Sequence, residues 1–432
     1  MELTEEITNE ANGKRLSMKL SVIIVNYNVK YYVDQCIRSV LRALPPVMPA
    51  EIIVVDNHSG DGSVEYLSAR YPKAEYPMLR IISSERNLGF ARANNIAIRQ
   101  SKGEYVLLLN PDTIVGEHVL EESIRFMDAH QDGGALGVKM LGVEGNAAME
   151  SRRGLPSPLV AFYKMMGFCR RWPKSRVFGH YYMGYLPWDE PAQIEVVSGA
   201  YCLLRKAALD KVGLLDEDFF MYGEDIDLSY RVLKGGYHNY YLPVSILHYK
   251  GESTEKSSFR YVHVFYEAML IFFRKHYSGM SLFFSFPIKV AIYAKASVAL
   301  MGMMSERVRK SLGFFVKGDV RPQRFVFVGT QGMLDACREI ADKFCLEAEY
   351  VKLGAEESGA EGSMTESLGA DCLEDLKVEA EPDKLCNVVF DADAISYEAM
   401  LDWMQRNPRK LVQLGTYCQA LGKIIVCRDV LG

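Results

Sequence analysis

The chain has 432 residues, with 50 Lys and Arg against 55 Asp and Glu and a formal net charge of −5. At roughly 100–200 residues per domain, this length predicts about two or three domains. A charged fraction of 24% with balanced signs argues against a chain-wide nucleic-acid-binding surface and against a disordered polymer. The 25 Tyr, 20 Phe and 20 Met favour an apolar or interfacial partner.

Nine cysteines are scattered singly, without a C-x-x-C pair that would indicate zinc, an iron–sulfur cluster or a redox dithiol. This pattern is typical of a reduced intracellular protein, so we expect a cytoplasmic location. Residues 1–17 begin with an acidic, polar stretch and lack the basic and apolar regions of a secretory signal. We expect a flexible tail there.

Between residues 20 and 130, short β-branched runs alternate with stretches of helical spacing. Strands are predicted at 21–25, 51–56, 80–83 and 105–109, and helices near 30–44, 61–70 and 89–100. Continuous apolar strands separated by helices indicate a mostly parallel sheet that is covered on both faces. The prediction is therefore an α/β fold of nucleotide-binding type, in which ligands bind beyond the carboxyl ends of the strands.

Polar residues follow these predicted strands and should converge on one edge of the sheet. They are Asn26, Tyr27 and Asn28 after the first strand, Asp56 and Asn57 after the second, Asn87 beyond the third, and Asn110 and Asp112 after the fourth. The phosphate-binding patterns G-x-G-x-x-G after the first strand and G-x-x-x-x-G-K-[ST] are both missing. A metal ion held by carboxylates is the remaining candidate for neutralising phosphate.

The middle of the chain changes character. Residues 150–196 are irregular, aromatic and basic, and a strand-like run is expected at 194–205. Glu224, Asp225 and Asp227 open a predicted helix, and a further apolar run ends at His248. Acids in the first turn of a helix also favour its positive end, and a lone His after an apolar run has a structural alternative.

Between Lys275 and Glu306 the only charged residues are Lys289 and Lys295, but the uninterrupted apolar stretches fall short of the roughly 18 residues of a convincing spanning helix. We expect amphipathic, membrane-associated helices, since the basic residues at 307–317 would meet anionic head groups. A helix packed on a neighbouring domain or subunit is the alternative. Residues 321–432 return to strand–helix alternation and predict a second, smaller Rossmann-like α/β domain of unknown role.

An ordered set of motifs resembles glycosyltransferase family 2, above all its rhamnosyltransferase-like and polysaccharide-assembly members. The motifs are SVIIVNYN (21–28), IIVVDNHSGDGS (52–63), RNLGFARANN (86–95), YVLLLNPDT (105–113), VSGAYCLLR (197–205), GLLDEDFFMYGEDIDLSYR (213–231) and HYKGES (248–253). The resemblance covers residues 18–275 and implies a GT-A fold. It implies inverting transfer of a hexosyl or deoxyhexosyl group from a UDP- or dTDP-sugar to a saccharide acceptor, expected to be polyprenyl-linked, in cell-surface polysaccharide assembly.

The resemblance also implies roles for individual residues. Asp225 would be the general base, and the acceptor would meet Glu224, Asp227, Gly199 and Ala200. The nucleotide sugar would contact Asn26, Tyr27, Asn28, Asp56, Asn57, Asn87, Arg92 and Asn110. Asp112 and His248 would bind Mn²⁺ or Mg²⁺, although Asn110 stands where the family has the first acid of its D-x-D motif. Asp56 has an alternative as an Asx-turn residue that closes its strand.

Two other functions remain open at this point. A catalytically inactive nucleotide- or saccharide-binding scaffold with the same fold would be consistent with Asn110. An oxidoreductase built on the C-terminal unit is disfavoured, because Gly329 and Gly332 do not complete a dinucleotide fingerprint. The organisation expected from the sequence is a tail at 1–17, a catalytic domain at 18–275, amphipathic helices at 276–320 and a C-terminal domain at 321–432. A peripheral position on the cytoplasmic face of a membrane and a homo-oligomer are further expectations.

Overall fold

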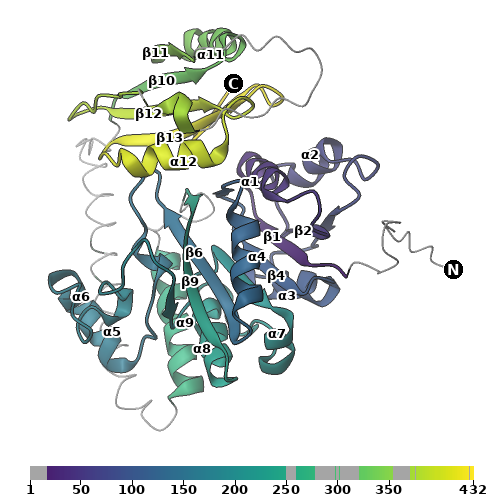
Figure 1. The fold of residues 1–432 in the computed structure, drawn as a ribbon, viewed down its shortest axis with the longest axis vertical. Helices are drawn as coiled ribbons and strands as arrows, with labels where there is room; N and C mark the ends of the chain where they lie inside the picture. Colours follow the sequence, from purple (N-terminus) through teal and green to yellow (C-terminus); the bar gives the residue numbers. More distant parts are fainter. Residues whose placement is uncertain are drawn as a thin grey trace.

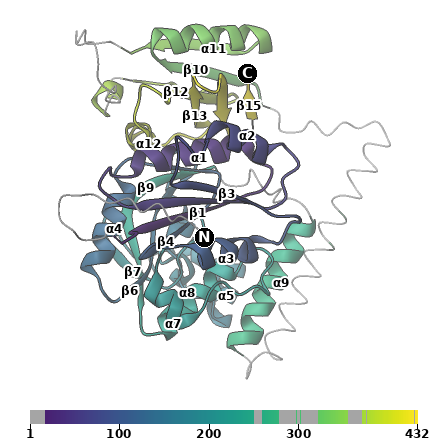
Figure 2. The same ribbon diagram turned by 90° about the vertical axis from the view of Figure 1, so that its right-hand side faces the viewer.

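The computed structural model describes residues 17–249, 259–277, 297, 301, 321–353, 370–374, 376–427 and 429–432. Within these residues the chain forms two β-sheets, a larger one from β1–β9 and a smaller one from β10–β15, which lies at the top of both views in Figures 1 and 2. The amphipathic helices expected at 276–320 and the tail expected at 1–17 lie almost entirely outside the described residues.

The larger sheet and its helices occupy the N-terminal part of the chain. The strands are β1 Leu20–Asn26, β2 Ala50–Asp56, β3 Leu79–Ser83, β4 Tyr105–Leu109, β5 Thr113–Val115, β6 Gly133–Leu141, β7 Ala192–Ile194, β8 Tyr201–Arg205 and β9 His238–His248. The helices are α1 Lys30–Ala43, α2 Ser63–Arg70, α3 Phe90–Gln100, α4 Val119–Ala129, α5 Pro158–Met165, α6 Phe168–Arg171, α7 Lys206–Val212, α8 Glu224–Lys234 and α9 Phe259–His276, with single turns η1 Met149–Ser151 and η2 His180–Tyr182.

The strand order of the larger sheet is β3-β2-β1-β4-β8-β6-β9-β5, with β7 paired to β9. Strands β3, β2, β1 and β4 are parallel, and so are β6 and β9. Strand β8 joins these two groups by antiparallel pairing with β4 and β6. The predicted α/β class with a mostly parallel sheet is confirmed, whereas the run expected as one strand at 194–205 is divided between β7 and β8.

Alternate residues of a strand point to opposite sides of the sheet, and in the parallel strands the residues on both sides are buried. On one face, Val22 and Ile24 of β1 join the core cluster that contains the apolar residues of α1. On the other face, Ile23 and Val25 pack with the apolar residues of α3 and α8. Figure 2 shows α1 and α3 on opposite sides of β1. Burial of each Val or Ile contributes about 1.5–3 kcal/mol, which explains the uninterrupted apolar sequence of this strand.

The smaller sheet has the order β11-β10-β12-β13-β14-β15. Its elements are β10 Gln323–Gly329, α11 Gln331–Phe344, β11 Glu347–Lys352, η4 Ala370–Leu373, β12 Leu385–Asp391, α12 Tyr397–Arg406, β13 Val412–Cys418, β14 Lys423–Val426 and β15 Asp429–Leu431. The first four strands in this order are parallel, as expected of a Rossmann-like unit, and the last two add antiparallel pairs. Figures 1 and 2 show α11 on the outer face and α12 on the face toward the larger sheet.

The two sheets share one apolar core. Helix α12 and strands β10, β12 and β13 contribute apolar side chains to a cluster that also includes residues of the larger sheet and its connections: Val29, Tyr32, Ile114, Leu141, Leu247 and Tyr249. We call this cluster the shared core. The domain boundaries at 275 and 321 therefore stay predictions, because described residues on both sides of them are buried together.

Polar contacts reinforce the shared core at its edge. The carboxylate of Glu117 accepts hydrogen bonds from the backbone N–H groups of Tyr397 and Glu398, each 2.8 Å long, at the first turn of α12. The Tyr32 hydroxyl donates to the carbonyl of Val426 over 2.8 Å. Arg38 of α1 pairs with Asp393 at 2.6 Å. These contacts hold the smaller sheet against α1 and the turn that follows β5.

Candidate active site

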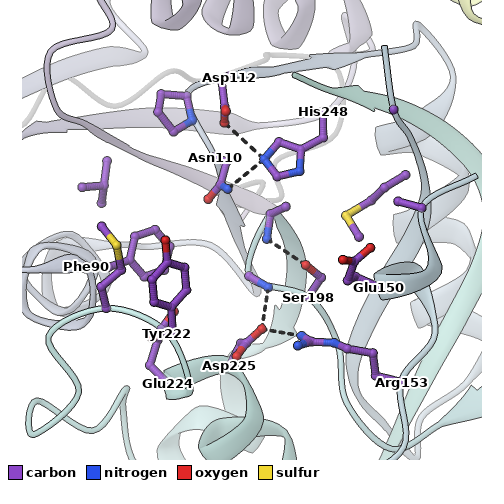
Figure 3. A pocket seen from close by; sticks show the side chains of 18 of the residues that line it. Phe90, Asn110, Asp112, Glu150, Arg153, Ser198, Tyr222, Glu224, Asp225 and His248 are labelled. Carbon is purple, nitrogen blue, oxygen red and sulfur yellow. Dashed lines mark hydrogen bonds and ion pairs between the residues drawn. The ribbon is translucent and has the colours of Figure 1, made fainter. Parts of the chain in front are cut away.

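One cleft, with a volume of about 400 Å³, lies beyond the carboxyl ends of β1, β2 and β4 and is closed by the segments that precede β8 and α8. Figure 3 shows two polar groups that face each other across it, one around His248 and one around Asp225. The predicted site residues that line this cleft are Tyr27, Asn57, Asn87, Asn110, Asp112, Gly199, Ala200, Glu224, Asp225 and His248. The structure thus brings together residues that are up to 221 positions apart in the sequence.

The first polar group contains Asn110, Asp112 and His248. The Nε2 atom of His248 lies 3.3 Å from Oδ1 of Asp112 and 3.2 Å from Nδ2 of Asn110. Asp112 is buried and His248 is mostly buried, and both line the cleft. A carboxylate and an imidazole at this separation fit a divalent cation whose remaining ligands are phosphate oxygens and water. The described residues contain no third His, Cys, Asp or Glu in this group.

Strand pairing explains why Asp112 and His248 meet. Strand β5 starts at Thr113, directly after Asp112, and runs antiparallel to β9 with Thr113 opposite His248. The next residues on both strands, Ile114 and Leu247, are opposite one another and are buried in the shared core. The polar pair is therefore positioned by a short antiparallel ladder whose rear side packs against the smaller sheet.

The second polar group centres on Asp225, in the first turn of α8. Its Oδ2 accepts a hydrogen bond from the Arg153 guanidinium and a longer one, 3.4 Å, from the Gly199 backbone N–H. Its Oδ1 accepts from the N–H of Ile226 at 2.8 Å. Burial lowers the pKa of Arg153, but the Asp225 carboxylate together with Tyr181 and Glu150 outweighs this, and the pKa is raised above its usual value. The carboxylate is thus held in one orientation at the wall of the cleft.

Glu224 is the second carboxylate of this group. It is buried, and its Oε2 has no hydrogen-bond partner among the described residues. Burial, followed by the neighbouring Asp225 carboxylate, raises the pKa of Glu224. A Cβ atom on Gly199 would lie 3.7 Å from the Cβ of Asp225 and 4.0 Å from Oε1 of Glu224. The glycine therefore keeps the surface beside both carboxylates free of a side chain.

Another part of the cleft wall carries the side-chain amides of Asn57 and Asn87, which are hydrogen-bonded to each other. The Nδ2 of Asn57 donates to Oδ1 of Asn87 at 3.0 Å, and Oδ1 of Asn57 accepts from the N–H of Leu88 at 2.8 Å. Gly89 has a φ of +81°, and a Cβ there would lie 2.5 Å from the carbonyl oxygen of Phe220. Only glycine fits this approach, which places the start of α3 against the loop before α8.

Other predicted site residues do not line the cleft. Asn26 and Asp56 are buried behind it, where the Asn26 amide donates to Asp56 at 2.8 Å and Asp56 accepts from the N–H of Ser59 at 2.9 Å. Asn28 accepts from the N–H of Gly60 at 2.7 Å in the same turn. These contacts match the Asx-turn alternative for Asp56.

Arg92 and Asp227 also lie away from the cleft. Arg92 is half exposed and lies 3.5 Å from Glu217. Asp227 is buried, where it pairs with Arg231 at 2.8 Å and with His276 at 2.6 Å, and so connects α8 to α9. In this structure the Asp227 carboxylate joins two helices, and a direct contact with an acceptor would require it to leave both partners.

The cleft also contains residues that the sequence did not single out as site residues. They are Val25, Gly89, Phe90, Pro111, Met140, Leu141, Gly142, Ala148, Glu150, Lys164, Tyr181, Tyr182, Ser198, Met221 and Tyr222, in addition to Arg153. Several of these come from residues 150–196, the stretch predicted to be irregular. The signal available in the sequence was the excess of aromatic and basic residues in this stretch.

Comparison with known proteins identifies the larger unit. Residues 21–213 match the family model described as glycosyl transferase family 2. This region is a family 2 glycosyltransferase domain. It contains Asn57 and Asn87, the Asn110–Asp112 turn and the residues that lead into β8, while Asp225 and His248 lie beyond the matched range.

Relatives of the glycosyltransferase domain extend the match. An N-acetylglucosaminyl-diphospho-decaprenol L-rhamnosyltransferase of Mycobacterium tuberculosis is 28% identical over 275 residues, which cover 60% of this chain and 85% of the relative. The poly(ribitol-phosphate) β-N-acetylglucosaminyltransferase TarS of Staphylococcus aureus is 30% identical over 135 residues, or 31% of this chain and 23% of TarS. A crystal structure of S. aureus TarS 1–349 aligns with 59% of this chain and 64% of that one, at a TM-score of 0.40 and 21% identity.

Among the helices in the described ranges, none combines the length and the apolar character needed to cross a bilayer. Most of the segment predicted to associate with a membrane, 276–320, lies outside those ranges.

Proposed function

We propose that this chain is an inverting glycosyltransferase that moves a hexosyl or deoxyhexosyl group from a UDP- or dTDP-sugar to a saccharide on a polyprenyl diphosphate. The observation that supports this proposal most is the shared cleft, in which the Asp112–His248 pair faces the Asp225–Arg153 pair. The first pair suits a nucleoside diphosphate and the second suits an acceptor hydroxyl. The M. tuberculosis relative named above acts, by its name, on a lipid-linked acceptor, which favours the same acceptor class here.

In the proposed reaction, the acceptor hydroxyl lies beside the Asp225 carboxylate, which takes its proton. The acceptor oxygen forms a bond to the anomeric carbon while the bond from that carbon to the diphosphate oxygen breaks, and the nucleoside diphosphate leaves with the electron pair. A single base and no covalent intermediate give inversion at the anomeric carbon. Arg153 and the Gly199 N–H keep the carboxylate oriented toward the cleft, which is the positioning that such a base requires.

Asp112 and His248 would hold the divalent cation, which when bound stabilises the negative charge that develops on the leaving diphosphate. An imidazole ligand favours Mn²⁺ over Mg²⁺. With Asn110 in place of a second acid, only one carboxylate contributes charge, so we expect tight cation binding only together with the nucleotide. Asn57 and Asn87 would form the wall beside the nucleotide.

The test is turnover of a panel of UDP- and dTDP-sugars with a polyprenyl-diphosphate saccharide acceptor, with Mn²⁺, with Mg²⁺ and with neither. We expect transfer with cation and a product whose anomeric configuration, read by NMR, is inverted. The substitution at position 110 favours one rival, a scaffold that binds nucleotide sugar without turnover. Binding of UDP or dTDP by the wild-type chain without any transfer or hydrolysis across the panel would favour that rival.

A further inference from the structure

A 38-residue stretch of the chain contains no acid. Residues 151–188 have no Asp or Glu but include seven Lys and Arg, in a protein whose net charge is −5. Of these seven, Arg170, Arg171, Lys174 and Arg176 are exposed on the segment that includes and follows α6. These four basic residues are therefore exposed to solvent, and no acid within residues 151–188 neutralises them.

The same segment exposes large apolar side chains. Among the described residues, twelve large apolar side chains are exposed, and five of them lie within residues 159–177. They are Leu159, Phe162, Met166, Trp172 and Val177, with exposed fractions between 45% and 57%. Leu159, Phe162 and Met166 recur at spacings of three and four residues, which places them along one face of α5 and its C-cap residue Met166. We call residues 158–178 the α5–α6 surface.

A cluster of packed aromatic rings supports the α5–α6 surface. The ring of Phe178 packs against Tyr163, Trp172 and Phe168, with centroid distances of 5.0, 5.3 and 5.5 Å. This aromatic cluster ties the segment after α6 back onto α5, so the exposed side chains stand on an ordered support. Figure 1 shows α5 and α6 projecting from the left side of the larger unit, in its lower half and away from the smaller sheet.

The surface adjoins the cleft. Lys164, on α5, lines the cleft with Tyr181 and Tyr182, and its Nζ lies 3.6 Å from the centroid of the Tyr181 ring. Helix α5 therefore contributes one side to the cleft wall, near Glu150 and Arg153, and carries apolar side chains on another. Whatever binds the α5–α6 surface lies beside the part of the cleft assigned to the acceptor.

We propose that the α5–α6 surface docks on an anionic lipid bilayer. Exposed apolar side chains enter the boundary between head groups and acyl chains, and Lys and Arg beside them bind the anionic head groups. Trp172 suits this boundary because its ring is apolar and its N–H is polar. A second copy of the chain fits less well, since pairing two such surfaces would bring their basic residues together without acids to neutralise them.

This proposal extends the proposed function, because a polyprenyl-linked acceptor resides in a membrane and the surface would bring the cleft to it. Its test does not need transfer activity. The full chain is sedimented with vesicles of phosphatidylcholine alone and of phosphatidylcholine mixed with phosphatidylglycerol, at low and high NaCl concentration. We expect association with the anionic vesicles that falls as salt rises.

Two variants address the surface, each with a matched control. Arg170→Glu/Lys174→Glu should reduce affinity for the anionic vesicles at least about tenfold, whereas Lys73→Glu/Lys102→Glu, which reverses two exposed charges elsewhere, should change it little. Phe162→Glu should also weaken association. Phe344→Glu is its control, because Phe344 is similarly exposed, 43% against 45%, and lies on α11 of the smaller sheet.

Equal vesicle affinity of the surface variants and their controls would overturn the proposal, as would binding that ignores lipid charge and salt. Sedimentation velocity without vesicles tests the alternative occupant, and a dimer that the surface variants abolish would also overturn it. Unfolding curves establish that each variant is folded. Nucleotide binding without vesicles should be the same in all four variants, so loss of the membrane contact and failure of the proposed transfer remain distinguishable.

Discussion

The contact between Glu117 and the first turn of α12 gives the sharpest prediction about the fold. Glu117→Gln keeps the shape of the side chain but removes its charge and one of its two acceptor oxygens. The carboxylate accepts two backbone hydrogen bonds of 2.8 Å, from Tyr397 and Glu398. A hydrogen bond to a charged group is worth about 1.5–3 kcal/mol, and a negative charge at a helix N-terminus adds about 0.3–1 kcal/mol.

Because the amide retains one acceptor, we expect Glu117→Gln to lower the free energy of unfolding by about 1.5–3 kcal/mol. The assay is equilibrium unfolding in urea, followed by far-UV circular dichroism and by tryptophan fluorescence, to which Trp403 on α12 contributes. Glu121→Gln is the control, since its exposed pair with Arg125 contributes about 0.5 kcal/mol or less. A loss for Glu117→Gln no greater than for Glu121→Gln would refute the assigned role of this contact.

Three predictions concern the cleft. Asp225→Asn should retain nucleotide binding and reduce transfer by about 10²–10⁴-fold, as loss of a general base does. The control Asp218→Asn, in the preceding loop, should leave transfer unchanged. Unchanged turnover of Asp225→Asn would place the base elsewhere. Asp112→Ala should abolish the Mn²⁺ dependence of nucleotide binding in calorimetry, and retained stimulation by Mn²⁺ would contradict the ligand role. Burial and the Asp225 charge raise the pKa of Glu224, so the folded chain holds this proton more tightly than the unfolded chain does. The resulting contribution to the free energy of unfolding falls as pH rises above about 4.5, the ordinary pKa of a Glu side chain. Glu224→Gln should therefore lose less stability than wild type from that pH upward to pH 8, and parallel stability curves would contradict this.

The parallel half of the larger sheet could be predicted because its signal is local. The strand predicted at 105–109 coincides with β4, and the helix predicted near 30–44 corresponds to α1, Lys30–Ala43. Strand β6, Gly133–Leu141, was not predicted, because its glycines suggest a turn. In the structure, glycine at position 134 is required by packing rather than by a turn, because a Cβ there would lie 2.5 Å from Val232 of α8. Close packing of a helix on a strand is a tertiary constraint that a single sequence does not reveal.

The candidate site also combines residues that could be placed from the local sequence pattern with contacts that could not. Residues directly after strands, such as Asn57 and Asn110, could be placed at the cleft from the α/β pattern. The contact between Arg153 and Asp225 joins residues 72 positions apart, and the Asp112–His248 pair depends on the register of β5 and β9. The helices α5 and α6 lie in a segment predicted to be irregular, since helices of 8 and 4 residues are too short for a helical period to stand out in a mixed aromatic and basic stretch.

The shared core limits how this protein can be divided for engineering. Cutting the chain near residue 275 would leave Tyr32, Ile114 and Leu247 uncovered. The pair Ile114–Leu247 adjoins the pair Thr113–His248 in the ladder of β5 and β9, and this ladder positions Asp112 and His248. A fragment that ends there should aggregate or lose order at those two residues. Chimeras that test the proposed acceptor role should instead exchange residues 151–196 and keep the C-terminal sheet unchanged, since that sheet supports the larger one.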